Sequence, residues 1–423
     1  MLMDLFNDYA HEFIELEETV ETLTLEAEQI DLALQFSQQA HPDQKWSVYL
    51  QKLAQFGFEK WLQKREPRLQ IHPPISSHGL ETICQLQVGE FKVCIIPVNG
   101  FSEVEIMIPR AIVELPEFAA HFYVPIGVAE DVDLTAVLGF IPYNQLVNYQ
   151  SQLQPLIDWT YAIPREWFNP DTDELLLNLQ CLAPSSIPLP AIPENRQAEL
   201  NTVKTQLETL LPQAVNRPLW QVLNWNQAKA LLPHAELLNW LRNSQTSLAI
   251  SELLQLLTQP AIELGTWLQN QLDDVSQSLA WQPLSIPVMR GSSLTVSPSI
   301  SPVVELEDIL SQLYSQYQIQ VSTEAACRRE SLPNDVQLYA ITWLQSPQEW
   351  VLLLIATTPT EVTSSPTMQW RISDENQVLI ERKLQPELGQ TYLFTQIVGE
   401  IGDKYLMNLT IDEKSQITRV FKF

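Results

Sequence analysis

The sequence is poor in positive charge. It contains 24 Lys and Arg residues against 51 Asp and Glu residues, which gives a formal net charge of −27. Proteins that bind nucleic acid directly need clustered Lys and Arg to neutralise phosphates, so this composition argues against such a partner. The same charge repels anionic lipid. A basic protein is the partner that complements an acidic surface. Acidity that serves only solubility is the alternative.

Long hydrophobic runs are also missing. The longest apolar run in the C-terminal third, Trp350 to Ala356, has seven residues, whereas a membrane-spanning helix needs about 20. The first ten residues contain Asp4 and Asp8 but no Lys or Arg, so they lack the basic region that opens a secretory signal peptide. The sequence therefore predicts a soluble, cytoplasmic protein without a membrane partner.

Cysteine is scarce, and the common catalytic motifs are absent. The four cysteines, Cys84, Cys94, Cys181 and Cys327, show no CxxC spacing, which argues against a disulfide framework or a zinc site. Cys84 and Cys181 lie in apolar, strand-like segments and are predicted to be core residues. The sequence has no phosphate-binding loop, dinucleotide-binding glycine motif, zinc-protease motif or nucleophile elbow, so no cofactor is expected.

Two polar clusters resemble metal sites, but neither has a complete set of ligands. His72 and His78 lie close together in the sequence, whereas a zinc site normally needs three or four ligands. Asp171, Asp173 and Glu174 alternate as in a calcium loop, but the glycine and the distal glutamate of such a loop are missing. We therefore expect no metal, and we interpret the acidic cluster as a solvated turn.

The sequence is nevertheless rich enough in apolar residues to form several cores. Hydrophobic residues make up 45% of the 423 residues, and a chain of this length is expected to form about two to four domains. The pattern predicts an α+β multidomain protein: N-terminal helices with an antiparallel sheet, a central helical segment and a C-terminal β-sandwich. The predicted boundaries are an acidic helical head with an α+β domain over 1–182, a Pro-rich linker over 183–195, a helical domain over 196–281, a Ser/Pro-rich linker over 282–304, and a short helix with the β-sandwich over 305–423.

The α+β domain is predicted to begin with helices. Apolar residues recur at three- and four-residue steps over 26–39 and 44–64, the spacing of a helix with one buried face. Trp46 is among the residues predicted to face inward. Four tryptophans in the helical domain are interpreted as core anchors: Trp220, Trp225, Trp240 and Trp267.

A β-hairpin is predicted next. Two strands over 82–88 and 91–98 flank a two-residue turn that begins with Gly89, as in a type II′ hairpin. Pairing the residues beside the turn puts alternate apolar side chains of both strands on one face. The same register puts Cys84 and Cys94 on opposite faces, so they are not expected to form a disulfide.

Further short apolar runs between turn residues predict the remaining elements. In the α+β domain they are strands over 103–108, 121–128, 133–141 and 156–163, with a short helix over 142–150. In the last domain a helix is predicted over 305–317. It is followed by seven strands of a small β-sandwich, over 337–344, 350–356, 367–373, 378–384, 391–398, 404–411 and 416–423.

The acidic charge is concentrated at the N-terminus. The first 44 residues contain eleven Asp and Glu residues and no Lys or Arg. Apolar residues from Leu2 to Leu16 follow helical spacing and leave carboxylates on the opposite side. These carboxylates are candidate partner-binding residues: Asp4, Asp8, Glu12 and Glu15. The apolar face either packs on the protein's own domain or enters a groove of a partner.

The linker over 282–304 contains one charged residue, Arg290, which Gly291 follows. Exposed linkers rich in small and polar residues are common sites of proteolysis. Arg290 and Gly291 therefore form a candidate cleavage site, and a passive tether is the alternative.

Several segments together carry a resemblance to a known family. They are the acidic helical head, HFYVPIGV and LTAVLGFIPYNQL, then IELGTWLQNQLDDVSQSLAW, and finally VQLYAITW, EWVLLLIA and LGQTYLFTQIVG. The combination resembles the cyanobacterial proteins grouped as domain of unknown function 1822, over nearly the whole chain. This family has no established activity, so the resemblance implies no catalytic residues. It implies a role in regulated signalling, because such proteins tend to occur near sigma factors and caspase-like peptidases.

Three functions fit these features. The first is a non-enzymatic regulatory adaptor whose acidic N-terminal module binds a basic protein, with a sigma factor as one candidate. The second is a substrate of a caspase-like peptidase, cleaved in the 282–304 linker. The third is an enzyme with a composite site in the α+β domain.

Overall fold

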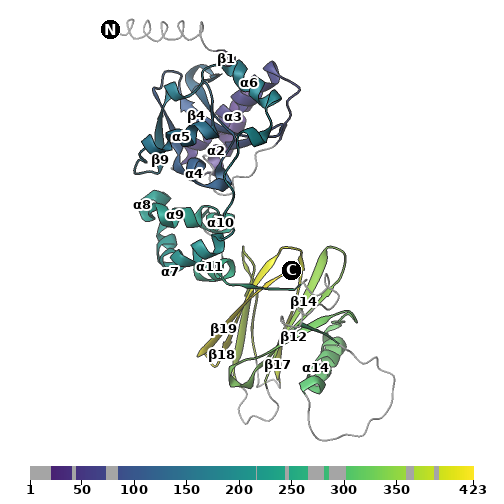
Figure 1. Cartoon of the computed structure of the whole chain (residues 1–423). Coiled ribbons are helices and arrows are strands. Elements are labelled where there is room, and N and C mark those ends of the chain that lie inside the picture. Colours follow the sequence, from purple (N-terminus) through teal and green to yellow (C-terminus); the bar gives the residue numbers. More distant parts are fainter. Residues whose placement is uncertain are drawn as a thin grey trace, which may run out of the picture. The chain divides into compact units, whose positions relative to one another are not determined.

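The computed structural model describes most of the chain (Figure 1). The described residues are 21–40, 44–72, 84–215, 217–242, 247–264, 281–284, 302–358, 366–384 and 390–423. The chain forms two compact units that divide between Ser244 and Gln245. Its mixture of helices and sheets confirms the predicted α+β multidomain fold. The finer boundaries, including the linkers over 183–195 and 282–304, stay predictions.

Two sets of candidate residues lie outside the described ranges. They are the carboxylates of the acidic head, Asp4, Asp8, Glu12 and Glu15, and the cleavage site at Arg290 and Gly291. Their roles therefore stay predictions.

A seven-stranded sheet forms the centre of the first unit. Its strands are β1 (Thr22–Thr24), β2 (Ile71–His72), β3 (Cys84–Val88), β4 (Phe91–Asn99), β6 (Phe122–Ala129), β7 (Leu134–Val137) and β8 (Ile141–Pro142). Their order is β1-β7-β6-β4-β3-β2, and β8 pairs with β6. The sheet is antiparallel, as predicted, except that β4 and β6 run parallel. Residues 100–121 connect these two strands and are long enough for the crossover that a parallel pair needs.

The hairpin of β3 and β4 has the predicted register. Cys84 pairs with Ile95, and Gly89 in the turn has a φ of +56°, a left-handed conformation that glycine adopts without strain. The predicted apolar face lies in the core of the unit. Cys84 and Cys94 are free thiols. Cys94 is also buried, so the second face of the hairpin is covered as well.

Helices α2 (Ala27–Gln39) and α3 (Lys45–Arg65) match the two predicted helices and belong to the same core. α3 contacts β4, β6 and β7, and its Trp61 is fully buried. Trp46 is 52% exposed, so its predicted inward orientation is wrong. The reason is its position in the first turn of the helix, because the buried residues of α3 begin at Val48.

Helix α6 (Thr172–Cys181) adds leucines to this core. The Asp171 side chain accepts hydrogen bonds from the backbone N–H groups of Asp173 and Glu174, at 3.0 and 3.3 Å, which stabilises the start of the helix. The acidic cluster interpreted as a solvated turn is therefore a helix cap. Cys181 is exposed at the end of this helix. Its prediction as a core residue of a strand is wrong, because only one side of the helix is buried.

Two segments lie at the second face of the sheet, one between β4 and β6 and one after β8. The elements near this face are β5 (Glu105–Pro109), α4 (Arg110–Glu114), α5 (Tyr143–Tyr149) and β9 (Thr160–Pro164). β5 and β9 form a separate antiparallel pair. Tyr123 of β6 joins the layers, because its buried hydroxyl donates a hydrogen bond to the backbone oxygen of Ile112 at 2.6 Å.

The helices that follow also belong to the first unit: α7 (Arg196–Ala214), α8 (Leu219–Val222), α9 (Trp225–Leu231) and α10 (Ala235–Arg242). Arg196, the first residue of α7, lies 2.7 Å from Glu117 in an ion pair with the α+β part of the unit. Trp220, Trp225 and Trp240 are half-buried rather than core residues, and Trp267 lies outside the described ranges.

The second unit is a β-sandwich, as predicted. One sheet has the order β10-β19-β18-β15-β16 and the other β11-β12-β13-β14-β17. The seven predicted strands are all present: β13 (Gln337–Leu344), β14 (Glu349–Thr357), β15 (Met368–Ser373), β16 (Val378–Lys383), β17 (Tyr392–Glu400), β18 (Lys404–Ile411) and β19 (Ser415–Lys422). Three strands escaped prediction: β10 (Ala261–Glu263), β11 (Trp281–Pro283) and β12 (Ala326–Ser331).

Each sheet of the sandwich has a helix on its outer side. α14 (Pro302–Tyr317) matches the predicted helix over 305–317, and its Leu313 packs against the outer face of the sheet that contains β14 (Figure 1). α11 (Ile250–Thr258) contacts β18 of the other sheet. Its Glu252 lies 3.0 Å from Nε of Arg371 in β15. The inner faces of both sheets share one core.

Candidate ligand-binding cleft

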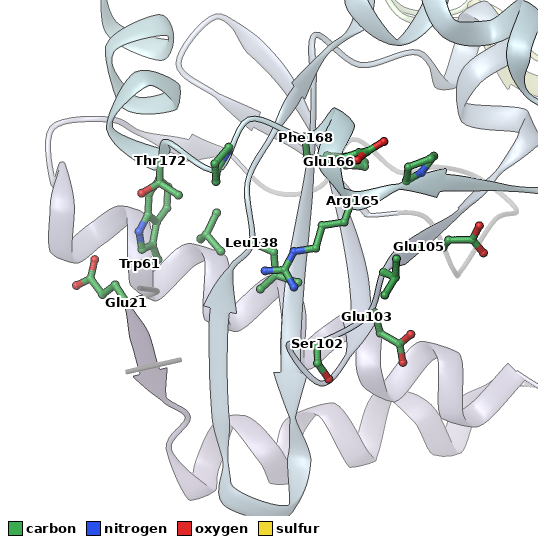
Figure 2. A pocket seen from close by; sticks show the side chains of 14 residues that line it. Glu21, Trp61, Ser102, Glu103, Glu105, Leu138, Arg165, Glu166, Phe168 and Thr172 are labelled. Atoms are coloured by element: carbon green, nitrogen blue, oxygen red, sulfur yellow. The ribbon is translucent and has the colours of Figure 1, made fainter. Parts of the chain in front are cut away.

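A cleft of about 800 Å³ opens on the first unit (Figure 2). α3 contributes Trp61 to its lining, β7 contributes Val137, and the start of α6 contributes Thr172. Most of the other described lining residues come from two segments, 102–105 and 164–170. Elements far apart in the sequence thus end at one place, and the size is within the range of ligand-binding pockets.

The apolar part of the lining is held by close packing. Trp61 and Phe168 are 1% and 3% exposed. Beside the lining residue Leu138, Gly139 has a φ of +143°, and a Cβ atom there would lie 2.7 Å from the backbone oxygen of Asn169. Only glycine permits this backbone conformation together with this approach. The wall of the cleft therefore has a fixed backbone.

Arg165 is the one basic residue among the described residues that line the cleft. Its backbone N–H donates a hydrogen bond to the oxygen of Val104 at 2.9 Å, and its guanidinium Nη1 donates to the backbone oxygen of Phe101. These two bonds attach the segment after β4 to the short helix η5 (Arg165–Trp167). The side chain is half-buried and extends into the cleft (Figure 2). No described carboxylate pairs with it.

Glutamates dominate the charge at the cleft. Glu103, Glu105 and Glu166 are exposed, and none of them forms a hydrogen bond or an ion pair with another described residue. Glu21 differs, because Lys64 Nζ lies 2.8 Å from its carboxylate. The hydrogen bond from Lys64 lowers the pKa of Glu21. The cleft therefore presents three carboxylates that are available to cations.

The described lining of the cleft lacks several side chains that enzymes commonly use as nucleophiles or bases. Among the described residues that line it there is no histidine, cysteine or lysine. Ser102 and Thr172 therefore have no imidazole or amine base to activate them as nucleophiles. The three unpaired glutamates lack the burial by which enzymes adjust a catalytic acid or base.

The described ranges contain neither a metal-binding cluster nor a membrane-spanning helix. No group of three or more His, Cys, Asp or Glu side chains in these ranges is placed to hold a metal ion. Of the predicted pair, His72 lies in β2, whereas His78 is outside the described residues. No helix in these ranges has the length and apolar character that crossing a bilayer requires.

A second polar cluster joins α9 to α4 and β9. Glu114 accepts hydrogen bonds from Arg110 Nε at 2.6 Å, from Trp225 Nε1 at 2.8 Å and from the Tyr161 hydroxyl. Burial alone would raise the pKa of Glu114, but these three hydrogen bonds lower it below its usual value. Burial and the bond to Glu114 raise the pKa of Tyr161 to about 12. Both carboxylate oxygens have partners, so this cluster anchors the helices and leaves no free group for a ligand.

The cleft was not predicted from the sequence. The predicted partner-binding and cleavage residues all lie outside the described ranges. One signal was available: Arg165 is the one Lys or Arg between Arg110 and Arg196.

The chain belongs to the family described as "Protein of unknown function (DUF1822)", because the family model matches residues 23–422. Neither a curated protein nor a solved structure matches the chain. The proposed function is therefore based on the cleft and its charged residues.

Proposed function

We propose that this member of the DUF1822 family is a cytoplasmic, non-enzymatic regulatory adaptor that binds a basic segment of a protein partner. The observation that carries this proposal is the set of unpaired carboxylates at the cleft, Glu103, Glu105 and Glu166. Lys and Arg side chains are the groups that such carboxylates attract. A sigma factor is one candidate partner, which fits the cyanobacterial family that the sequence resembles.

The charge of the whole chain supports this function. A net charge of −27 attracts a basic protein over a longer distance than any single carboxylate and raises its rate of association. The same charge disfavours nucleic acid as a competitor at the cleft. The acidic N-terminal segment with Asp4, Asp8, Glu12 and Glu15 adds to this attraction.

The division into two units is also compatible with an adaptor. Each unit has its own hydrophobic core, and the cleft and the β-sandwich belong to different units. In the proposed role the first unit holds the basic segment, while the β-sandwich contacts another component.

Charge reversal at the cleft tests the proposal. The double variant Glu103→Lys/Glu166→Lys is compared with wild type for binding to purified sigma factors and to lysine-rich peptides at low salt. We expect a loss of affinity of about tenfold or more, because two attractive contacts become repulsive. Fluorescence anisotropy gives the affinities, and a salt titration is expected to weaken wild-type binding steadily.

The matched control is Glu90→Lys/Glu194→Lys, which makes the same change in net charge at exposed residues of the same unit outside the cleft lining. Its affinity is expected to change by less than that of the cleft variant. Equal losses in both variants, or binding that salt does not affect, would count against the cleft as the binding site.

A further inference from the structure

Arg165 has more hydrogen-bond donors than the protein uses. A guanidinium carries five N–H groups, and Phe101 is its one hydrogen-bond partner among the described side-chain contacts of Arg165. The remaining donors belong to a half-buried side chain that extends into the cleft (Figure 2). A cation held partly out of water without a counter-ion is costly. Its position is therefore suited to an anionic group of a ligand.

The surrounding charges select which anion can bind there. Three unpaired carboxylates at the same cleft, Glu103, Glu105 and Glu166, repel a phosphate, which carries close to two negative charges at neutral pH. A single carboxylate meets less repulsion, and cationic groups on the same ligand turn that repulsion into attraction. Arg and carboxylate also match in geometry, because two N–H groups bind two oxygens side by side.

The size of the cleft further restricts the kinds of ligand that can bind. A cleft of about 800 Å³ is the size of a small-molecule pocket rather than a groove along which a long chain passes. The end of a peptide fits such a pocket, and capture of a terminal carboxylate is a known mode of peptide recognition.

We infer that the cleft recognises the C-terminus of a basic peptide: Arg165 binds the terminal carboxylate, and Glu103, Glu105 and Glu166 bind nearby Lys or Arg side chains. This inference rests on the proposed function and adds how the partner is held. The partner it describes is a protein whose last residues are basic and whose C-terminus is accessible.

Two forms of one labelled peptide test the inference. A short peptide of alternating Lys and Gly carries its label at the N-terminus and ends either in a free carboxylate or in an amide. We expect wild type to bind the free acid about tenfold more tightly or better, the effect of a charge-assisted pair of hydrogen bonds. In Arg165→Gln this preference is expected to disappear, while the backbone N–H of residue 165 can still donate to the oxygen of Val104.

If Arg165 has only a structural role, the result differs: Arg165→Gln then lowers the affinity for both peptides equally. Equal binding of the two peptides to wild type would overturn the inference even if Arg165→Gln failed to fold. If that equal binding still depends on Glu103 and Glu166, the proposed function stands without it. Failure of both peptides to bind would contradict both proposals. Free lysine and unlabelled peptide are also compared as competitors of the labelled peptide. If free lysine competes equally well, the ligand is a free amino acid and not a protein partner, which would overturn the inference.

Discussion

Two arginines of the first unit pair with carboxylates that are largely buried. Arg196 of α7 binds Glu117 of another element, and Arg110 binds Glu114 one turn further along α4, with side-chain exposures of 21% or less in all four residues. Arg165 departs from this pattern, because its guanidinium bonds to a backbone oxygen and leaves donors toward the cleft. In the proposed mode of binding, these donors are the reason that Arg165 takes the anionic group of the ligand.

The anchoring role of Glu114 predicts a pH-dependent stability. Glu114→Gln removes the charge that Arg110, Tyr161 and Trp225 bind, and we expect it to lower the free energy of unfolding by about 1–3 kcal/mol at neutral pH. The folded pKa of Glu114 lies below its ordinary value of 4.5. The carboxylate's contribution is therefore complete above that value and is lost as the pH falls through the folded pKa.

Urea denaturation of wild type and Glu114→Gln at several pH values measures this effect. The difference between the two proteins is expected to shrink as the pH falls below 4.5, because the protonated acid then resembles the amide. Glu90→Gln, at an exposed turn, is the control and is expected to change little. A difference that stays constant into the acid range would contradict the anchoring role.

The wall of the cleft predicts a strict requirement for glycine. Gly139→Ala introduces a Cβ atom 2.7 Å from the backbone oxygen of Asn169 at a φ of +143°. We expect the free energy of unfolding to fall by about 1–3 kcal/mol or more, since neither the oxygen nor the backbone angle can relax easily.

Gly100→Ala is the matched control for this substitution. Gly100 also has a positive φ, of +78°, but a Cβ atom there meets nothing within 4 Å. Gly100→Ala is expected to lower the free energy of unfolding by less than Gly139→Ala, because it introduces backbone strain without a close contact. Thermal unfolding of both variants separates the two effects, and equal losses would show that the contact with Asn169 does not matter.

At the scale of elements, alternation of apolar and polar residues was the most informative pattern in the sequence. β13 and β18 match their predicted bounds residue for residue, and the β3–β4 hairpin has the predicted register, because apolar side chains of each strand pack into a core. β12 was missed because Arg328, Arg329 and Glu330 interrupt its apolar pattern.

The same sequence patterns do not predict the cleft. Its residues extend from Glu21 to Thr172, and they meet because the ends of α3, β7 and β9 converge after folding. The acidic turn at Asp171 shows the same limit, since its role as a helix cap depends on the helix that follows. Local spacing defines an element, but which elements end at one place depends on long-range packing.

The docking of α11 gives a prediction for the second unit. Glu252 is 14% exposed and lies 3.0 Å from Nε of Arg371. Glu252→Ala leaves that guanidinium with one less partner in a partly buried site. We expect a loss of about 1–3 kcal/mol in the free energy of unfolding.

Glu263→Ala is the control, because Glu263 forms a more exposed ion pair with Lys422, at 3.2 Å. Exposed pairs contribute about 0–1 kcal/mol, so its loss is expected to be small. Urea denaturation followed by a signal from the β-sandwich measures both variants. A loss for Glu263→Ala as large as that for Glu252→Ala would mean that burial of the ion pair is not the cause.

At the scale of the whole molecule, charge and architecture both fit the proposed binding of a basic partner. The chain carries −27, its first unit has a cleft with unpaired carboxylates, and its second unit is a separate β-sandwich. In the proposed function, the net charge attracts a basic partner, and the cleft selects the part of that partner that binds.

The position of a bound basic peptide tests the proposed binding at the cleft most directly. A carbodiimide joins a carboxylate to a lysine amine only when the two are in contact, and mass spectrometry then identifies the joined residues. With a lysine-rich peptide, we expect cross-links at Glu103, Glu105 and Glu166 that high salt removes. Cross-links spread equally over exposed glutamates outside the cleft, such as Glu90 and Glu194, would contradict the proposed binding.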